Sequence, residues 1–219
     1  MEPDQTPYPV LKFLSEFAEI YKTLNHLPHW QQDRSTYFLT FRLGDSIPAV
    51  LLSEWRRARD QWCLEHPKPW SSATEDEYHQ RFSTVIDRLL DQGYGSCLFR
   101  DSANADIVTG AFRHFDHRRY LLHSWVIMPN HMHLLLTHDA SIPLARIAAS
   151  WKRFTATKIH QRNQSSGRMW QKDYFDRIIR DWDHFMNVAR YIRRNPLKAK
   201  LPDGAFLLEE AAWVKRLLS

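Results

Sequence analysis

Two histidines two residues apart, His131 and His133, are the side chains with the clearest capacity for chemistry in this chain of 219 residues. They open the apolar segment 131–137, which predicts a β-strand. Because side chains two apart in a strand point to the same face, both imidazoles would stand side by side with Met132 turned away. Such a pair can coordinate one divalent metal ion, or it can be two half-buried histidines bonded to the backbone.

A second candidate group is Tyr191, in the segment 182–194, whose periodicity predicts a helix. Tyr191 and Asn195 fall one turn apart at the edge of its apolar stripe. The stripe itself consists of Phe185, Val188, Ala189 and Ile192. Taken singly, Tyr191 fits a ring at the edge of the core, and Asn195 fits a helix stop before Pro196.

The histidine pair and the tyrosine together indicate a specific chemistry. A phenol has a pKa near 10 and is a poor nucleophile until its proton is withdrawn. A metal ion that polarises a phosphodiester lowers the barrier from the side of the electrophile. The phosphotyrosine formed in this way keeps the energy of the broken bond, so a second DNA end can reverse the reaction. The combination favours strand exchange over simple hydrolysis.

The elements that must position these groups follow from the hydrophobic periodicity. We expect strands at 37–41, 119–128, 131–137 and 174–179, and helices at 10–24, 49–65, 75–91, 102–115, 142–163, 182–194 and 206–217. Neighbouring strands joined by the turn 129–130 are antiparallel, and the long connections carry helices. This order predicts an α+β protein in which helices pack on one side of an antiparallel sheet.

The charge of the chain is unevenly distributed. The net charge is +5, yet residues 140–219 hold 16 Lys and Arg against 7 Asp and Glu, whereas residues 1–139 hold 14 against 18. A basic part interleaved with aromatic residues suits a polyanion with bases to stack on, and it also suits a solvated basic surface. No apolar run approaches the roughly 20 residues of a membrane span. Two cysteines and an N-terminus without a signal pattern favour the cytoplasm.

Four segments, in this order, carry a resemblance to a known family: Leu122–Leu135, Trp151–Thr155, Gly167–Arg180 and Tyr191–Ala199. In them the sequence resembles the REP-associated tyrosine transposases, a branch of the IS200-like single-tyrosine transposases within the HUH (His-hydrophobe-His) endonucleases. The resemblance covers about residues 35–201. Lys200 departs from it, because the family usually has glycine there, and the tail lacks the usual Trp-Ser-Ser ending.

The resemblance implies a ferredoxin-like antiparallel sheet with helices packed on it, the architecture of HUH endonucleases. It divides the chain into an N-terminal helical extension and linker (1–34), a transposase domain (35–201) with an enlarged helical segment (45–95), and a C-terminal helical tail (202–219). It implies Mg²⁺ or Mn²⁺ on His131 and His133, attack by Tyr191 on single-stranded DNA and a covalent 5′-phosphotyrosine. Asn195 occupies the place of a further metal ligand, unless it only ends the helix.

The resemblance also implies palindromic, REP-like hairpin DNA as the partner, bound by a monomer or a homodimer. The cations that we expect against phosphates are Lys152, Arg153, Arg168, Lys172, Arg177, Arg180, Arg190 and Arg194. Trp170 would stack on an unpaired base and Gln171 would bond a base edge, with a solvated charge or a core tryptophan as the alternative for each.

Two other classes of function compete with a transposase. One is a non-catalytic protein that binds hairpin DNA as a regulator, against which the intact His131, His133 and Tyr191 argue. The other is a metal-dependent hydrolase built on the histidine pair. That reading requires a carboxylate ligand close by, and the neighbouring strand segments offer only Asp139.

Overall fold

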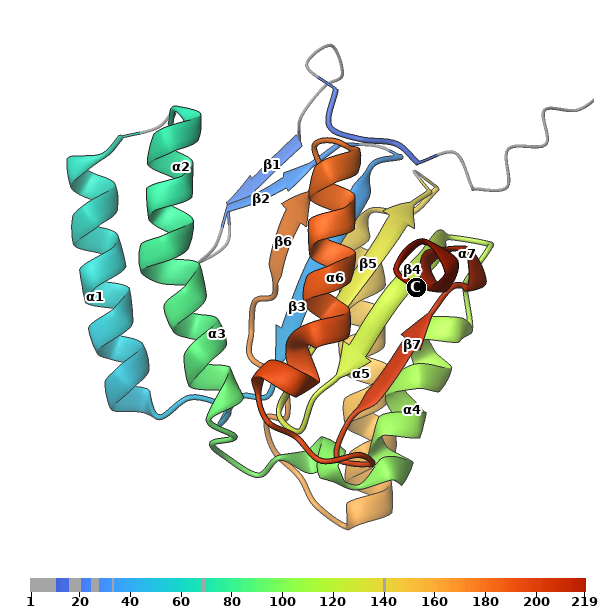
Figure 1. Cartoon of the computed structure of the whole chain (residues 1–219). Helices are drawn as coiled ribbons and strands as arrows, with labels where there is room; N and C mark the ends of the chain where they lie inside the picture. The colour runs from blue at the N-terminus through green and yellow to red at the C-terminus, as the bar shows by residue number, and fades with distance from the viewer. Residues whose placement is uncertain (1–10, 16–20, 25–27, 33, 68–69, 140) are drawn as a thin grey trace, which may run out of the picture.

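The main sheet of the protein has five strands. In the computed structural model, residues 1–10, 16–20, 25–27, 33, 68–69 and 140 lie outside the described part of the chain (Figure 1). The strands of the sheet are β3 (Thr36–Arg42), β4 (Tyr120–Ile127), β5 (His131–His138), β6 (Phe175–Ile178) and β7 (Leu207–Glu210). They pair antiparallel in the order β6-β3-β5-β4-β7.

The connection of these strands is that of a ferredoxin-like unit. β3 leads through α4 (Ser102–Arg113) to β4, and β5 leads through α5 (Leu144–Asn163) to β6. Together they form a β-α-β-β-α-β unit. In the sheet, β6 lies beside β3, and β5 lies between β3 and β4. The predicted α+β, ferredoxin-like antiparallel sheet is therefore confirmed, with β7 added at the edge next to β4.

Helices cover both faces of the sheet, so the expectation of helices on one side is wrong. α4 and α5 lie on one face, and α6 (Trp182–Lys198) and α7 (Ala212–Leu217) lie on the other (Figure 1). The reason is the composition of the central strands. Met132, Leu134 and Leu136 of β5 pack on the α4 and α5 side, whereas Leu135 packs on the α6 side. A strand that is apolar on both faces needs cover on both.

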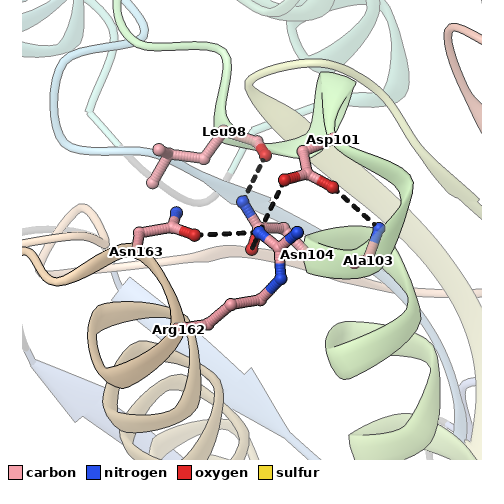
Figure 2. Close-up of polar contacts among 6 residues, drawn as sticks. All are labelled: Leu98, Asp101, Ala103, Asn104, Arg162 and Asn163. Carbon is pink, nitrogen blue, oxygen red and sulfur yellow. Dashed lines mark hydrogen bonds and ion pairs between the residues drawn. The ribbon is translucent and has the colours of Figure 1, made fainter.

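A polar cluster joins α4 and α5 on the face opposite α6 (Figure 2). Arg162, near the end of α5, donates to the Asp101 carboxylate (2.5 Å) and to Asn104 Oδ1 (3.2 Å). Asp101 also caps α4, since its side chain accepts from the Ala103 amide at 3.0 Å. The Arg162 hydrogen bond holds the pKa of Asp101 below its usual value. The two helices that support β4 and β5 from behind are thus fixed to each other.

The enlarged segment is helical, as predicted. It forms α1 (Ala49–Glu65), α2 (Ser72–Tyr78), the π-helical turn η1 (His79–Ser83) and α3 (Thr84–Asp91), beside the β6 edge of the sheet (Figure 1). A short 3-10 turn, η2 (Leu98–Arg100), then leads into α4. Buried Trp62 of α1 packs on Phe82, and Asp91 at the end of α3 pairs with Lys198 of α6 at 3.5 Å. The segment therefore reaches the α6 side of the sheet.

The predicted N-terminal helix over 10–24 is wrong where the structure describes it; residues 10 and 16–20 of it lie outside the described part. Tyr21–Leu24 is a strand, β1, paired with β2 (Pro28–Gln31), and residues 11–15 are not helical. The Lys12 carbonyl accepts from Thr36 N (2.7 Å), and Leu14 N donates to the Ile179 carbonyl (2.9 Å). Hydrogen bonds to the sheet therefore replace those of a helix.

The C-terminal tail is only partly helical. The predicted helix 206–217 is instead β7 followed by α7, because Leu207–Glu210 pair with the free edge of β4. The expectation that Asn195 and Pro196 end the preceding helix is also wrong, since α6 continues to Lys198. Pro196 lies inside this helix and removes one i→i−4 hydrogen bond from it. None of the helices in the described residues is long and apolar enough to span a lipid bilayer.

Candidate active site

The first two residues of interest lie at the start of the central strand β5. His131 and His133 point toward α6, with ring centroids 5.0 Å apart. His133 Nδ1 lies 2.8 Å from Thr40 Oγ1 on the neighbouring strand, and His131 Nδ1 lies 2.8 Å from Asn130 Oδ1. In each ring one nitrogen is engaged, which leaves Nε2 as the nitrogen that can bind a metal. The predicted juxtaposition of the two imidazoles is present.

Both imidazoles are held neutral. Burial, and then the charge of Lys198, lower the pKa of His131 to about 3. Burial also lowers the pKa of His133 well below its usual value, with smaller effects from His131 and Lys198. A neutral imidazole has a lone pair to donate, so this state suits metal binding without loss of a proton.

The tyrosine lies on α6, directly over the histidines. Asp181 starts the helix by accepting a hydrogen bond from His184 N at 2.7 Å. Buried Phe185, Ala189 and Ile192 then hold the helix on the sheet, as the predicted stripe requires. This places the Tyr191 hydroxyl 3.3 Å from His133 Nε2. Residues 58 positions apart in the chain are thereby brought into one site.

An acidic residue that the sequence reasoning missed also faces the tyrosine. Asp87 of α3 interacts with the Tyr191 hydroxyl. Burial raises the pKa of Asp87 to about 6, against the opposing effects of that hydrogen bond and of Lys198. Burial, and then the negative charge of Asp87, raise the pKa of Tyr191 well above 10. In sequence Asp87 resembles any acid on a helix surface, so no local signal marks it.

Asn195 lies one turn after Tyr191, inside the helix. Its side chain is buried, with 1% of its surface exposed. Its amide lies near enough to the Tyr191 hydroxyl to lower the pKa of that phenol, but neither amide atom makes a well-formed hydrogen bond within the described part of the chain. A buried amide without a well-formed hydrogen bond is costly, and an ion that binds its oxygen would offset that cost. The donor set of two neutral imidazoles and one amide oxygen therefore fits a divalent metal.

The described residues add no acidic cluster to the two imidazoles and the Asn195 amide oxygen. Among the described residues, no three or more His, Cys, Asp and Glu side chains are grouped so that they could hold a metal ion. Asp139, the carboxylate that a hydrolase would need, is exposed beyond the other end of β5 from His131. The described residues therefore bring two histidines, a tyrosine and an asparagine together without a cluster of carboxylates.

The cations predicted to contact DNA are in different environments. Exposed ones are Arg153, Arg168, Lys172, Arg190 and Arg194, and half-buried ones are Arg177 and Arg180. Lys152 is engaged within the protein, because its ammonium donates to the carbonyls of Gln171 (2.5 Å) and Lys172 (2.6 Å). Burial lowers the pKa of Lys152 to about 8. Its place in the structure is a link between α5 and the segment before β6.

Trp170 lies in the core, which contradicts the expected stacking on a DNA base. Only 7% of its surface is exposed. Its ring packs 5.4 Å from the Phe99 ring, and its Nε1 donates to Thr155 Oγ1 at 3.0 Å. The alternative of a core tryptophan is therefore the one that the structure supports. Gln171 beside it is half-buried.

Fold and site together define a class of protein: a ferredoxin-like sheet with a His-hydrophobe-His pair on a central strand and a tyrosine on a helix above it. Residues 98–195 match the family model described as "Transposase IS200 like", so the resemblance to IS200-like transposases is confirmed for that part of the chain. The matched region contains His131, His133, Tyr191 and Asn195 and excludes α1 to α3.

A solved structure, described as the REP-associated tyrosine transposase bound to a REP hairpin, is similar to this chain with a TM-score of 0.40 and 16% sequence identity. The similarity covers 84% of this chain and 74% of that one. No curated protein matches the chain significantly.

Proposed function

We propose that the protein is a transposase that cuts and rejoins single-stranded DNA beside palindromic hairpins, through a covalent 5′-phosphotyrosine on Tyr191. The observation that carries this proposal is the 3.3 Å distance between the Tyr191 hydroxyl and His133 Nε2. A metal ion at the histidine Nε2 atoms would bring a bound phosphate next to that hydroxyl, as a near-attack geometry requires. The match of residues 98–195 to IS200-like transposases supports the same activity.

The residues of the site have separate parts in the reaction. His131, His133 and Asn195 would hold Mg²⁺ or Mn²⁺, which when bound polarises the phosphodiester. The Tyr191 oxygen forms a bond to phosphorus while the bond from phosphorus to the 3′ oxygen breaks. The Asp87 carboxylate accepts the phenolic proton, and the departing 3′ oxygen takes up a proton from water. A 3′ hydroxyl of a second DNA end can later attack the phosphotyrosine and release Tyr191.

The test is the formation of a denaturant-resistant protein–DNA adduct. Labelled single-stranded DNA that covers the palindromes flanking the gene in its genome is incubated with the protein and Mn²⁺ or Mg²⁺. We expect an adduct with the wild type and none with Tyr191→Phe, whereas Tyr94→Phe, which alters a partly exposed tyrosine, keeps it. His131→Ala should weaken it.

The two competing functions give different results. Cleavage that persists in Tyr191→Phe would exclude the tyrosine mechanism and favour a metal-dependent hydrolase. Hairpin binding without cleavage in either metal would favour a regulatory protein.

We also propose that a single chain contains one complete site. Tyr191 and His133 of the same chain meet, so one chain would supply both the nucleophile and the metal ligands of one site. This supports catalysis by a single chain. A homodimer and a cytoplasmic location both stay predictions.

A further inference from the structure

Arg42 ends β3 directly opposite His131 on β5. Cross-strand partners lie on the same face of a sheet. Thr40, two residues earlier, bonds His133 on the face that carries the site. The Arg42 side chain therefore lies on the histidine face, where it donates to the Ser46 hydroxyl at 3.2 Å.

Two further arginines, from distant parts of the chain, act on Arg42 through their charges. The segment that contains Arg168 runs along the end of β3, because Gly44 N donates to the Met169 carbonyl (2.8 Å) and Gln171 N to the Arg42 carbonyl (3.0 Å). Arg56 comes from α1. The charges of Arg56 and Arg168 both act on Arg42, and with burial as the larger cause they lower its pKa to about 10. Arg42 thus remains charged at neutral pH.

None of these three arginines forms an ion pair with an acid in the part of the chain that the structure describes. The nearest acid in sequence, Asp45, is engaged elsewhere, because its carboxylate accepts from the Ser96 amide at 2.7 Å. The charge of Asp173 acts on Lys152. Three like charges held together repel one another, and a bound anion would remove that cost.

We propose that Arg42, Arg56 and Arg168 form a binding site for one backbone phosphate of the DNA strand, next to the phosphate that is cleaved. This inference rests on the proposed function and deepens it. Arg42 lies opposite His131, so a strand held at the histidines can reach the site, and guanidinium groups suit phosphate because they can donate two hydrogen bonds at once. Arg56 gives the enlarged helical segment a role in holding DNA.

The first test measures binding of a fluorescent oligothymidine to the full chain in EDTA, by anisotropy at several salt concentrations. Phosphate contacts are independent of sequence, so this probe does not require the natural hairpin. Arg56 is exposed on α1. Arg56→Gln should raise the Kd about three- to ten-fold, and it should lower the slope of log Kd against the logarithm of the salt concentration by about 0.7. The control is Arg118→Gln. Arg118 is exposed and lies two residues before Tyr120, which pairs with His138 at the end of β5 opposite His131. The control variant should change neither the Kd nor the slope.

The second test finds the phosphate. Methylphosphonate linkages, which remove one phosphate charge each, are placed singly along the oligothymidine with its position fixed by a hairpin at one end. We expect a methylphosphonate at one position, adjacent to the cleaved linkage, to weaken DNA binding by the wild type. The same methylphosphonate should not weaken binding further in Arg56→Gln or Arg168→Gln. Equal losses from Arg56→Gln and Arg118→Gln, or a methylphosphonate penalty that persists unchanged in Arg56→Gln, would overturn the proposal.

The anisotropy measurement does not depend on cleavage. Binding in EDTA can show the phosphate site even if no tyrosine adduct ever forms, in which case the proposed function fails and the site stands. An adduct that forms normally while Arg56→Gln binds like the wild type would remove the phosphate site and leave the proposed function intact.

Discussion

At the scale of single residues, the candidate site depends on which polar atoms already have partners. Thr40 and Asn130 each engage one nitrogen of a histidine, and this orients the other nitrogen. The Asn195 amide makes no well-formed hydrogen bond within the described residues. A metal ion would bind the two histidine Nε2 atoms and the Asn195 amide oxygen. The question whether Asn195 ends the helix is answered by α6, which continues for three more residues to Lys198.

We therefore expect Asn195→Ala to weaken Mn²⁺ binding by roughly 10- to 100-fold, in the range that supporting groups at metal sites show. The change removes no well-formed hydrogen bond, so the folded structure should persist. Isothermal titration with Mn²⁺ measures the effect. Asn187→Ala, at an exposed position of the same helix, is the matched control, and unchanged affinity in Asn195→Ala would remove Asn195 from the metal site.

The position of Asp87 predicts how adduct formation depends on pH. A pKa raised to about 6 means that Asp87 is a carboxylate above pH 6 and is protonated below it. Because the pKa of His131 is about 3, that histidine does not titrate in this window. The rate of adduct formation in the wild type should fall as the pH drops through about 6.

Asp87→Asn should lose this step and form the adduct roughly 10²-fold more slowly, since an amide cannot accept the phenolic proton. Single-turnover assays between pH 5 and pH 8, on the order of half a unit apart, would show it. Asp91→Asn, whose carboxylate pairs with Lys198, should keep the step near pH 6. A wild-type profile that stays flat through this range would exclude Asp87 as the proton acceptor.

At the scale of elements, the helix that carries Tyr191 is bonded to the C-terminal part of the chain. Arg193 of α6 donates twice to the Glu210 carboxylate of β7, at 2.9 and 2.7 Å, and once to the Leu218 carbonyl at 2.7 Å. The Glu210 side chain is largely buried. β7 and α7 therefore support the position of Tyr191 from the side away from α3.

Arg193→Ala should destabilise the fold by about 2 kcal/mol, because it leaves the Glu210 carboxylate buried without its partner. Urea denaturation of the variant measures this loss. Arg194→Ala changes an exposed neighbour on the same helix and should stay within about 0.5 kcal/mol of the wild type. Equal stability of the two variants would show that the pair adds nothing.

At the scale of the whole molecule, burial of histidines links stability to pH. His123 lies at the bulge in β4, with its Nε2 2.7 Å from Thr137 Oγ1 and its ring against Phe185 and Trp213. Burial lowers the pKa of His123 from 6.5 to about 3. The folded chain keeps this imidazole neutral at pH values at which the unfolded chain protonates it.

The free energy of unfolding should therefore fall as the pH drops from 6.5 toward 3, with His123 contributing about 1.4 kcal/mol per pH unit. Denaturation of the wild type and of His123→Gln at several pH values would isolate this contribution. The variant should start less stable and depend less on pH. His114→Gln, at an exposed position, should keep the wild-type dependence, and an unchanged slope in His123→Gln would contradict the prediction.

Local periodicity predicts elements whose hydrogen bonds and faces are set within the segment itself. The helices at 49–65, 102–113 and 144–163 and the hairpin of β4 and β5 are of this kind. The prediction from local periodicity was wrong near both ends of the chain. Residues 21–24 and 207–210 form strands through partners elsewhere, and those partners are not visible in a window of the sequence.

By itself, the sequence determined the spacings within the site. His131 and His133 share a face because a strand repeats every two residues, and Asn195 follows Tyr191 by one turn because a helix repeats every 3.6. Only the tertiary structure decided that α6 covers that face, that Asp87 meets Tyr191, and that Trp170 turns into the core. Local periods fix the direction of a side chain relative to its own element, whereas packing between distant segments fixes what it faces.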